Sequence, residues 1–292
     1  MSERPPVRIV AESRCHEGRQ LTVEHPSEAC GCPMRFALFL PPGLAEGGKA
    51  PALYFLSGLT CTEENFTVKA GAQRFAAEAG LALVAPDTSP RNTGIPGEDD
   101  EDFLGSGAGF YVDATRAPWS AHYRMYDYVS RELPQFVESS FPIDPARRGI
   151  CGHSMGGHGA LVIALRNPGR YRSVSALAPI SNPSSSPWGR AAFSAYLGDE
   201  SPAWREYDAS ALVRKAPLDL EIRIDLGSAD PFREDELMVE QFLAACRESG
   251  QRVSFHLRGG YDHGYFFVST FIEGHIRHHA AALRTGDASA GG

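Results

Sequence analysis

The sequence predicts an α/β protein in which a mostly parallel central sheet is covered by helices on both faces. Two observations lead to this prediction. After about residue 50, short apolar runs typical of strands alternate with stretches typical of helices, which is the pattern of a parallel sheet buried on both faces. Before residue 50, three runs alternate apolar and polar residues, as antiparallel strands do.

The composition narrows the class of protein. The 292-residue chain is 42% hydrophobic and 22% charged, as globular proteins usually are. Its formal charge of -8 repels phosphate backbones, so a nucleic-acid partner is not expected. No apolar run is long enough to span a membrane, and the start, MSERPPVRIV, lacks the apolar segment of a secretory signal. We therefore expect a cytoplasmic protein without a membrane partner, whose six cysteines are reduced.

The first half of the chain supplies both kinds of strand. The antiparallel N-terminal strands are expected at 7–10, 20–25 and 34–42. The apolar strand ALYFLSG then ends in glycine, and a helical stretch follows it. A further strand, a long loop and a helix that Pro134 interrupts come next. These elements are expected at 52–58 (strand), 63–80 (helix), 81–87 (strand), 88 to about 118 (loop) and 120–139 (helix).

The second half repeats the strand–helix alternation. Each strand is a short apolar run, and the helix after the strand that ends at Ser154 is closed by a Pro-Gly pair. The strands are expected at 147–154, at 173–180, in the first part of 220–230, which ends as a loop, and at 253–260. The helices are expected at 155–167, within 184–215, at 233–250 and from Tyr265. One domain is expected over 1–284, followed by a flexible tail at 285–292.

The stretch CGHSMGGHGA at 151–160 contains the clearest functional motif. Gly152-His153-Ser154-Met155-Gly156 fits G-x-S-x-G between a strand and a helix, which is the context of a nucleophile elbow. There the serine adopts a strained backbone so that its Oγ projects above the sheet, and the glycines avoid collisions. We predict that Ser154 is a nucleophile; the alternative is a glycine-rich turn with an idle serine.

A serine nucleophile needs a base, and the elbow's fold orders its residues Ser, Asp or Glu, then His. His263 follows the last strand within GGYDHGYFF (259–267) and is the predicted base. Asp230 follows a strand in LGSAD and is the predicted acid, with a helix N-cap as the alternative. Asp225 lies inside that strand and competes weakly.

The remaining histidines are expected to be structural. His153 and His158 are too near the serine in sequence to act as its base, and His256 lies inside a strand. The group at 275–279 places three histidines on one helical face, where a metal site is one interpretation and a solvated helix end the favoured one. The three cysteines at positions 15, 30 and 32 match no zinc pattern, so no metal is predicted. An acyl-transfer site built on a serine needs no cofactor, and none is predicted.

The oxyanion of an acyl-transfer intermediate needs two N–H donors. One is expected from Met155, the residue after the nucleophile. The other is expected from Leu59 in SGLTC (57–61), with Gly58 and Thr60 as neighbours that could serve.

Several longer motifs resemble one family, the S-formylglutathione hydrolases, also called esterase D. The resemblance runs from about Cys32 to about Ala281. It implies an α/β-hydrolase fold and hydrolysis of S-formylglutathione to glutathione and formate. The matching motifs are LSGLTCTEENF (56–66), GAGFYVDAT (107–115), YRMYDYV (123–129), GHSMGGHGAL (152–161), APISNP (178–183), PWG (187–189), GYDHGYFF (260–267) and IRHHA (276–280).

Position by position, the resemblance implies roles for the residues that the motifs predict. The family's triad falls on the same serine, aspartate and histidine, and its oxyanion donors on Leu59 and Met155. Its active-site cysteine falls on Cys61, with a buried structural thiol as the alternative. Members often form homodimers, so the resemblance allows a homodimer here.

The chain departs from the family pattern around the substrate. The loop PGEDDEDF lacks a tryptophan before its Asp-Phe pair, and its acidic residues 98–102 are expected to be solvated. Pro231 stands where a polar residue is usual, and Ser181 where a cysteine is frequent. Candidate partners of glutathione carboxylates are Lys69, Arg91 and Arg116, and candidate pocket walls are Trp119 and Trp188.

Three other functions are alternatives to this one. A general small-acyl carboxylesterase would use the same triad. An acyltransferase of the mycolyl-transfer kind would use a similar elbow, but the start of the chain shows no secretory signal. A non-catalytic binding protein with a hydrolase fold would not need an intact triad.

Overall fold

The computed structural model describes residues 7–44, 46–199 and 202–284. The predicted tail at 285–292 lies outside the described residues, and the single domain over 1–284 stays a prediction. Within the described part, nine strands form one sheet in the order β1-β2-β3-β5-β4-β6-β7-β8-β9. They are β1 (Arg8–Cys15), β2 (Gly18–Ser27), β3 (Cys32–Leu40), β4 (Ala50–Leu56), β5 (Ala82–Pro86), β6 (Ile143–His153), β7 (Ser173–Leu177), β8 (Ile222–Gly227) and β9 (Val253–Arg258).

The sheet changes from antiparallel to parallel pairing along its width. β1, β2 and β3 pair antiparallel, and β3 pairs antiparallel with β5. From β5 through β4, β6, β7 and β8 to β9, neighbouring strands are parallel. The carboxyl ends of these parallel strands therefore share one edge of the sheet, where ligands of such sheets bind. This arrangement confirms the predicted α/β-hydrolase fold.

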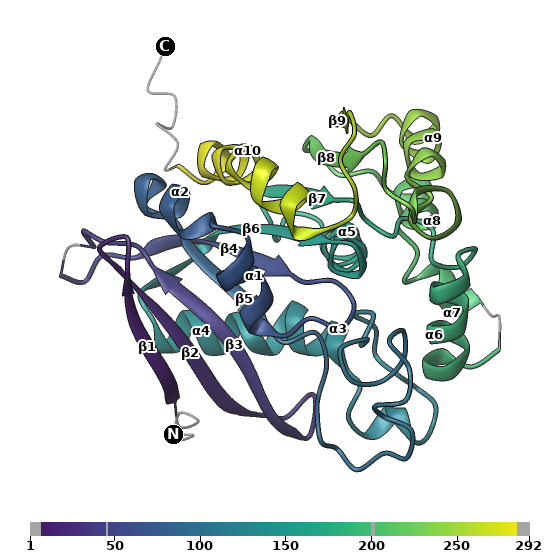
Figure 1. The fold of residues 1–292 in the computed structure, drawn as a ribbon, viewed down its shortest axis with the longest axis horizontal. Coiled ribbons are helices and arrows are strands. Elements are labelled where there is room, and N and C mark those ends of the chain that lie inside the picture. Colours follow the sequence, from purple (N-terminus) through teal and green to yellow (C-terminus); the bar gives the residue numbers. More distant parts are fainter. Residues whose placement is uncertain (1–6, 45, 200–201, 285–292) are drawn as a thin grey trace.

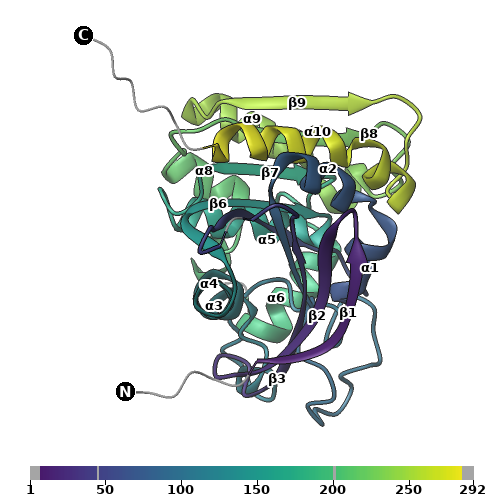
Figure 2. The same ribbon diagram turned by 90° about the vertical axis from the view of Figure 1, so that its left-hand side faces the viewer.

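Helices cover both faces of the sheet (Figures 1 and 2). On one face, α10 (Tyr265–Leu283) packs against α2 (Ala72–Ala79) and over β6 to β8, and α1 (Glu63–Lys69) lies beside β5. On the other face, α5 (Met155–Arg166) packs on β4, β6 and β7 and against α8 (Ala209–Lys215), and α4 (Leu133–Ser140) packs on β6. The remaining segments are α3 (Met125–Asp127), α6 (Pro187–Leu197), α7 (Pro202–Arg205), α9 (Val239–Ser249), a 3₁₀ turn (Trp119–Ala121) and two π turns (Tyr128–Glu132, Arg233–Leu237).

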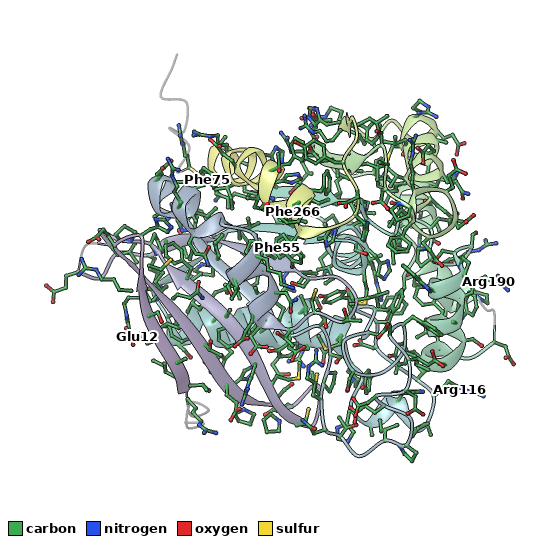
Figure 3. All side chains as sticks on the ribbon, viewed as in Figure 1. Glu12, Phe55, Phe75, Arg116, Arg190 and Phe266 are labelled. Atoms are coloured by element: carbon green, nitrogen blue, oxygen red, sulfur yellow. The ribbon has the colours of Figure 1, made fainter. Side chains whose placement is uncertain are left out.

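Alternate residues of the central strands point to opposite helical layers. Phe55 of β4 stacks on Phe66 of α1, with ring centroids 3.6 Å apart. The hydroxyl of its neighbour Tyr54 donates a hydrogen bond to Glu138 of α4 on the other face. Figure 3 shows Phe55 among the interior side chains, whereas Glu12 projects outward from β1. Burial on both faces explains why the strands after residue 50 are continuous apolar runs.

Three helices predicted as single segments are divided. The stretch 233–250 forms a π turn and then α9, with Met238 between them at φ of +50°. The stretch 63–80 forms α1 and α2, because Gly71 between them adopts a left-handed conformation with φ of +65°. The stretch 120–139 consists of short turns that lead into α4. Pro134 has no N–H for a regular helix, and just before it the Leu133 N–H bonds to the carbonyl of Tyr128, five residues back.

The prediction of a solvated end for the last helix was wrong. His275 and His279 of α10 have 0% exposed surface. They face β7, where the hydroxyls of Ser173 and Ser175 lie 2.6–2.8 Å from the ring nitrogens. Helical spacing placed these histidines on one face, but it did not reveal that serines of a distant strand would satisfy them inside the protein.

The acidic loop is solvated except at its first residue. The four residues 99–102 are exposed, as predicted. Glu98 is buried, and its carboxylate accepts hydrogen bonds from the Tyr123 hydroxyl (3.0 Å) and the Thr93 N–H (2.9 Å). Glu98 therefore anchors the start of the loop and leaves the rest of it in solvent.

Three general findings concern the chemistry available to the chain. Across the described ranges, no group of three or more His, Cys, Asp or Glu side chains could hold a metal ion. None of the described helices combines the length and apolarity needed to cross a membrane. The six cysteines of the chain are all free thiols, as the composition predicted.

Candidate active site

Ser154 lies between β6 and α5 in a strained backbone conformation, with φ of +58° and ψ of -121°. A non-glycine residue rarely adopts a positive φ. The two motif glycines permit it by close packing: a Cβ on Gly152 would lie 2.0 Å from the Gly156 carbonyl oxygen, and a Cβ on Gly156 would lie 2.0 Å from that of Leu56. The Ser154 N–H donates to the Leu177 carbonyl of β7 at 3.0 Å. The turn therefore has the strand–turn–helix context of an elbow.

His263 and Asp230 form a hydrogen-bonded pair on the loops after β9 and β8. Nδ1 of His263 lies 2.6 Å from Oδ2 of Asp230, whose side chain is fully buried. The other carboxylate oxygen accepts the Phe232 N–H at 2.9 Å. A carboxylate at Nδ1 keeps the proton there and leaves Nε2 as the acceptor. His263 lines the same cavity as Ser154, so the structure brings the three predicted residues together.

The two predicted oxyanion donors occupy different elements. Met155 is the first residue of α5, and the first N–H groups of a helix have no acceptor within it. Leu59 belongs to a turn that the Cys61 N–H closes by donating to the Gly58 carbonyl at 3.3 Å. Among the described residues, the Leu59 N–H has no hydrogen-bond acceptor. Leu59 lines the cavity that holds Ser154, so its N–H is available to a ligand there.

The cavity has a volume of about 560 Å³ and contains both predicted pocket residues, Cys61 and Trp188. The Trp188 ring packs against Phe232, with centroids 4.8 Å apart. Burial raises the pKa of the Cys61 thiol, which keeps it protonated at neutral pH. Because a thiol reacts as its thiolate, Cys61 is a poor nucleophile in this position.

Three other candidates lie outside the cavity. Arg91 pairs with Asp87, with Nε 2.8 Å from Oδ2, and lines a different cavity. The Arg116 side chain lies beside Gly198. Trp119 is a buried core residue. Of the three proposed cations, Lys69 is the one that lines the cavity with Ser154.

His153 makes a contact that the sequence did not reveal. Its ring centroid lies 4.7 Å from that of His263, and its Nε2 lies 3.0 Å from the His263 carbonyl oxygen. Burial, together with the neighbouring His263, lowers the pKa of His153 well below its usual value. The neutral ring can therefore donate Nε2–H to that carbonyl and hold the loop of the predicted base. The sequence offered one signal for this role, the position of His153 next to the nucleophile. It could not reveal the contact itself, because the two histidines are 110 residues apart.

Comparisons with known proteins identify the family of the chain. The Esterase family model, described as "Putative esterase", matches residues 27–278. The S-formylglutathione hydrolase of Mus musculus is 55% identical over 276 residues, which are 94% of this chain and 98% of that protein. This chain belongs to the S-formylglutathione hydrolase family.

Bacterial members of the S-formylglutathione hydrolase family are similarly close. The protein of Paracoccus denitrificans is 53% identical over 94% of this chain and 97% of its own length. The solved S-formylglutathione hydrolase of Agrobacterium tumefaciens matches with a TM-score of 0.92 at 44% identity, over 94% of this chain and 99% of that one. The chain is therefore an enzyme, a serine hydrolase of this family.

Proposed function

We propose that this chain hydrolyses S-formylglutathione to glutathione and formate through an acyl-enzyme on Ser154. The observation that carries the proposal is a single cavity holding Ser154, His263 with its buried carboxylate partner, and the unpaired N–H of Leu59. Relatives 53–55% identical over nearly the whole chain are S-formylglutathione hydrolases, which supports the formyl thioester as substrate.

The reaction follows from the positions of these groups. Nε2 of His263 takes the Ser154 hydroxyl proton as Oγ attacks the formyl carbonyl carbon, and the N–H groups of Leu59 and Met155 bind the oxyanion. The carbon–sulfur bond then breaks, and His263 gives its proton to the glutathione sulfur. Water attacks the formyl ester with His263 as base, formate leaves, and Ser154 recovers its proton. Asp230 orients the imidazole and stabilises its charged form.

The charges around the cavity suit a glutathione thioester at both ends. Lys69 lies over the Tyr265 ring, 5.6 Å from its centroid, and it forms no ion pair with another described residue. It supplies a cation for one substrate carboxylate. Glu101 and Asp102 line the same cavity and supply partners for the substrate ammonium. The second substrate carboxylate would then remain in solvent.

Initial rates with S-formylglutathione, S-acetylglutathione and p-nitrophenyl acetate test the proposal. We expect kcat/KM for the formyl thioester to exceed the others by orders of magnitude and to be lost in Ser154→Ala. Comparable turnover of the aryl ester would instead identify a general small-acyl carboxylesterase with the same triad. A homodimer and a cytoplasmic location stay predictions, which light scattering and cell fractionation test.

A further inference from the structure

The turn that carries the Leu59 N–H is strained. It runs from Gly58 to Cys61, and its third residue, Thr60, has φ of +64°. Glycine or asparagine usually takes this position of such a turn, and a β-branched residue there is a conformational outlier. A strained backbone persists only where surrounding contacts impose it. The contacts around this turn therefore decide where the Leu59 N–H points.

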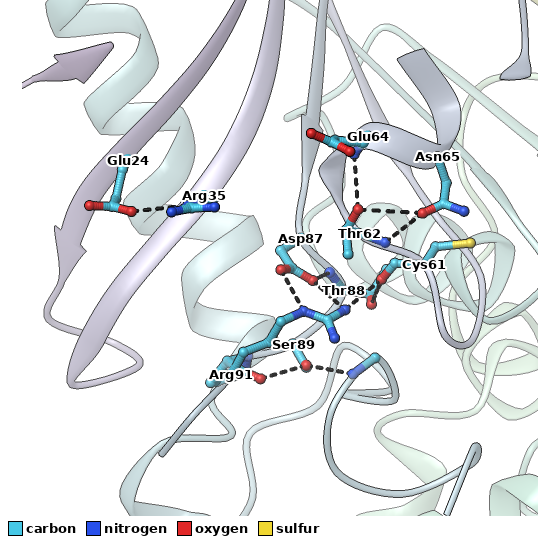
Figure 4. Close-up of polar contacts among 12 residues, drawn as sticks. Glu24, Arg35, Cys61, Thr62, Glu64, Asn65, Asp87, Thr88, Ser89 and Arg91 are labelled. Carbon is cyan, nitrogen blue, oxygen red and sulfur yellow. Dashed lines mark hydrogen bonds and ion pairs between the residues drawn. The ribbon is translucent and has the colours of Figure 1, made fainter. Parts of the chain in front are cut away.

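Hydrogen bonds with two other segments hold the turn. The Thr60 N–H donates to the Gly107 carbonyl at 2.9 Å. The Cys61 carbonyl accepts two hydrogen bonds, from the Thr88 hydroxyl at 2.5 Å and from Nη2 of Arg91 at 2.9 Å (Figure 4). The carbonyl next to the strained residue is thus fixed by two donors from the segment that follows β5.

Arg91 is itself fixed by Asp87. Its Nε lies 2.8 Å from Oδ2, and its Nη2 lies 3.0 Å from Oδ1. The Asp87 side chain is 9% exposed, and its Oδ1 also accepts the Thr88 N–H at 2.7 Å. A planar guanidinium can bridge a carboxylate and a carbonyl at once, whereas the compact ammonium of lysine lacks this fork geometry.

We propose that Arg91 is a positioning residue of the oxyanion hole. By tying the Cys61 carbonyl to the carboxylate of Asp87, it keeps the strained turn in the geometry that aims the Leu59 N–H at the reacting carbonyl. The inference rests on the proposed acyl-transfer mechanism. Arg91 does not line the substrate cavity; it lines a second cavity of about 510 Å³, formed by residues of β2, β3, α1 and the segment after β5.

Loss of the hydrogen bond from Arg91 to the Cys61 carbonyl should weaken stabilisation of the transition state. A displaced N–H binds the oxyanion less well, but substrate binding depends on the rest of the cavity. In Arg91→Ala we expect kcat to fall about tenfold to a hundredfold, with little change in KM. Arg91→Lys keeps the charge but not the bridge, so its kcat also falls. Rates are measured with both S-formylglutathione and p-nitrophenyl acetate.

Arg35→Ala is the matched control. Arg35 lines the same second cavity, and its side chain pairs with Glu24, with Nε 2.9 Å from the carboxylate. Its side chain has no hydrogen bond to the turn among the described residues. We expect this variant to keep the wild-type kcat. The comparison separates loss of the Arg91 hydrogen bond to the Cys61 carbonyl from a general change in the charge of that cavity.

Chemical rescue separates positioning from a merely structural role. Removal of the Arg91 side chain leaves a space beside Asp87 that adjoins the second cavity. Guanidinium chloride, kept far below denaturing concentrations, is expected to restore part of kcat in Arg91→Ala but not in Arg35→Ala. Sodium chloride at equal ionic strength is the salt control. A purely structural role would lower the melting temperature without a guanidinium-specific recovery of kcat.

A folded Arg91→Ala protein with wild-type kcat would overturn the proposal, as would equal losses in Arg91→Ala and Arg35→Ala. If Arg91→Ala does not fold, a folded Arg91→Lys protein with wild-type kcat overturns it. Failure of the proposed function gives a different result. The wild type would then show no preference for the formyl thioester, while the Arg91→Ala defect on p-nitrophenyl acetate would persist.

Discussion

The chain contains two Asp–His–Ser arrangements, and only one of them adjoins an open cavity. The first is the proposed catalytic triad at the carboxyl ends of the parallel strands. The second lies beneath α10, where one ring nitrogen of His275 is 3.1 Å from Asp225 and the other is 2.8 Å from the Ser175 hydroxyl. The same three residue types thus lie close together twice within one fold.

The second arrangement lacks what catalysis needs. Asp225, His275 and Ser175 have no exposed surface, so substrate cannot reach them. Asp225 also accepts hydrogen bonds from Arg223 and Arg258 at 3.0 and 2.6 Å. Burial alone would raise the pKa of Asp225, but contacts with His275 and the two guanidinium groups lower it to about 2. Ser175 lies within β7, without the positive φ of the elbow serine.

The comparison teaches that residue types and hydrogen bonds do not by themselves make an active site. The proposed site adds three features: a strained nucleophile at a strand end, an unpaired N–H beside it, and a cavity of about 560 Å³. The buried arrangement instead satisfies polar groups between the sheet and α10. Equivalent substitutions in the two arrangements should therefore have different consequences.

The largest difference in kcat is expected between the alanine variants of Ser154 and Ser175. Ser154→Ala removes the nucleophile, so kcat should fall by a factor on the order of a million. Ser175→Ala should leave kcat near the wild-type value, because Ser175 contacts no substrate. Both are measured with p-nitrophenyl acetate on proteins whose fold is verified by circular dichroism. Loss of activity in a folded Ser175→Ala protein would contradict this division of roles.

Substitution of Asp230 should affect catalysis, whereas substitution of Asp225 should affect stability. Asp230→Asn disturbs the tautomer of the base, and kcat is expected to fall roughly ten-thousandfold with little loss of stability. Asp225→Asn should instead lower the free energy of unfolding, measured in urea. The Arg223 and Arg258 side chains retain 18% and 27% exposure. The loss should therefore be smaller than the about 3–5 kcal/mol of fully buried pairs. Equal kcat losses in both variants would remove the distinction.

The buried histidines should make stability depend on pH. Burial lowers the pKa of His275 and His279, so below about pH 6.5 the unfolded state binds protons that the native state excludes. Their contribution is fully present above that pH. It declines as pH falls, by up to about 1.4 kcal/mol per pH unit for each histidine.

Urea unfolding at several pH values tests this dependence. Because His153 and His158 are shifted in the same direction, His279→Gln should reduce the slope without abolishing it. A free energy of unfolding that stays constant between neutral and mildly acidic pH would contradict the prediction.

The smallest change in kcat is expected for a substitution of Cys61. Cys61→Ala removes a protonated thiol from the cavity but leaves in place the backbone carbonyl that Arg91 holds. We expect kcat to stay near the wild-type value and the melting temperature to fall slightly. A loss of kcat as large as that of Ser154→Ala would mean that the thiol takes part in the chemistry.

The sequence by itself determined the features whose residues are close together or follow chain order. The elbow lies within ten consecutive residues, so its strand, its turn and its glycines are visible at once. Asp230 and His263 were predicted because each follows a strand, and parallel strands bring their carboxyl ends to one edge. The positions of helix breaks were less predictable. Gly71 ends a helix through its own conformation, and the π turn before Pro134 depends on local hydrogen bonding.

Only the tertiary structure decided which polar groups are buried and what they contact. The burial of His279, the contact of His153 with the loop of His263, and the tie from Arg91 to the turn that ends at Cys61 all join distant segments. Their partners are 106, 110 and 30 residues away. No local pattern reveals such partners, because burying a polar side chain is tolerable only when the folded chain supplies the opposite hydrogen-bonding group.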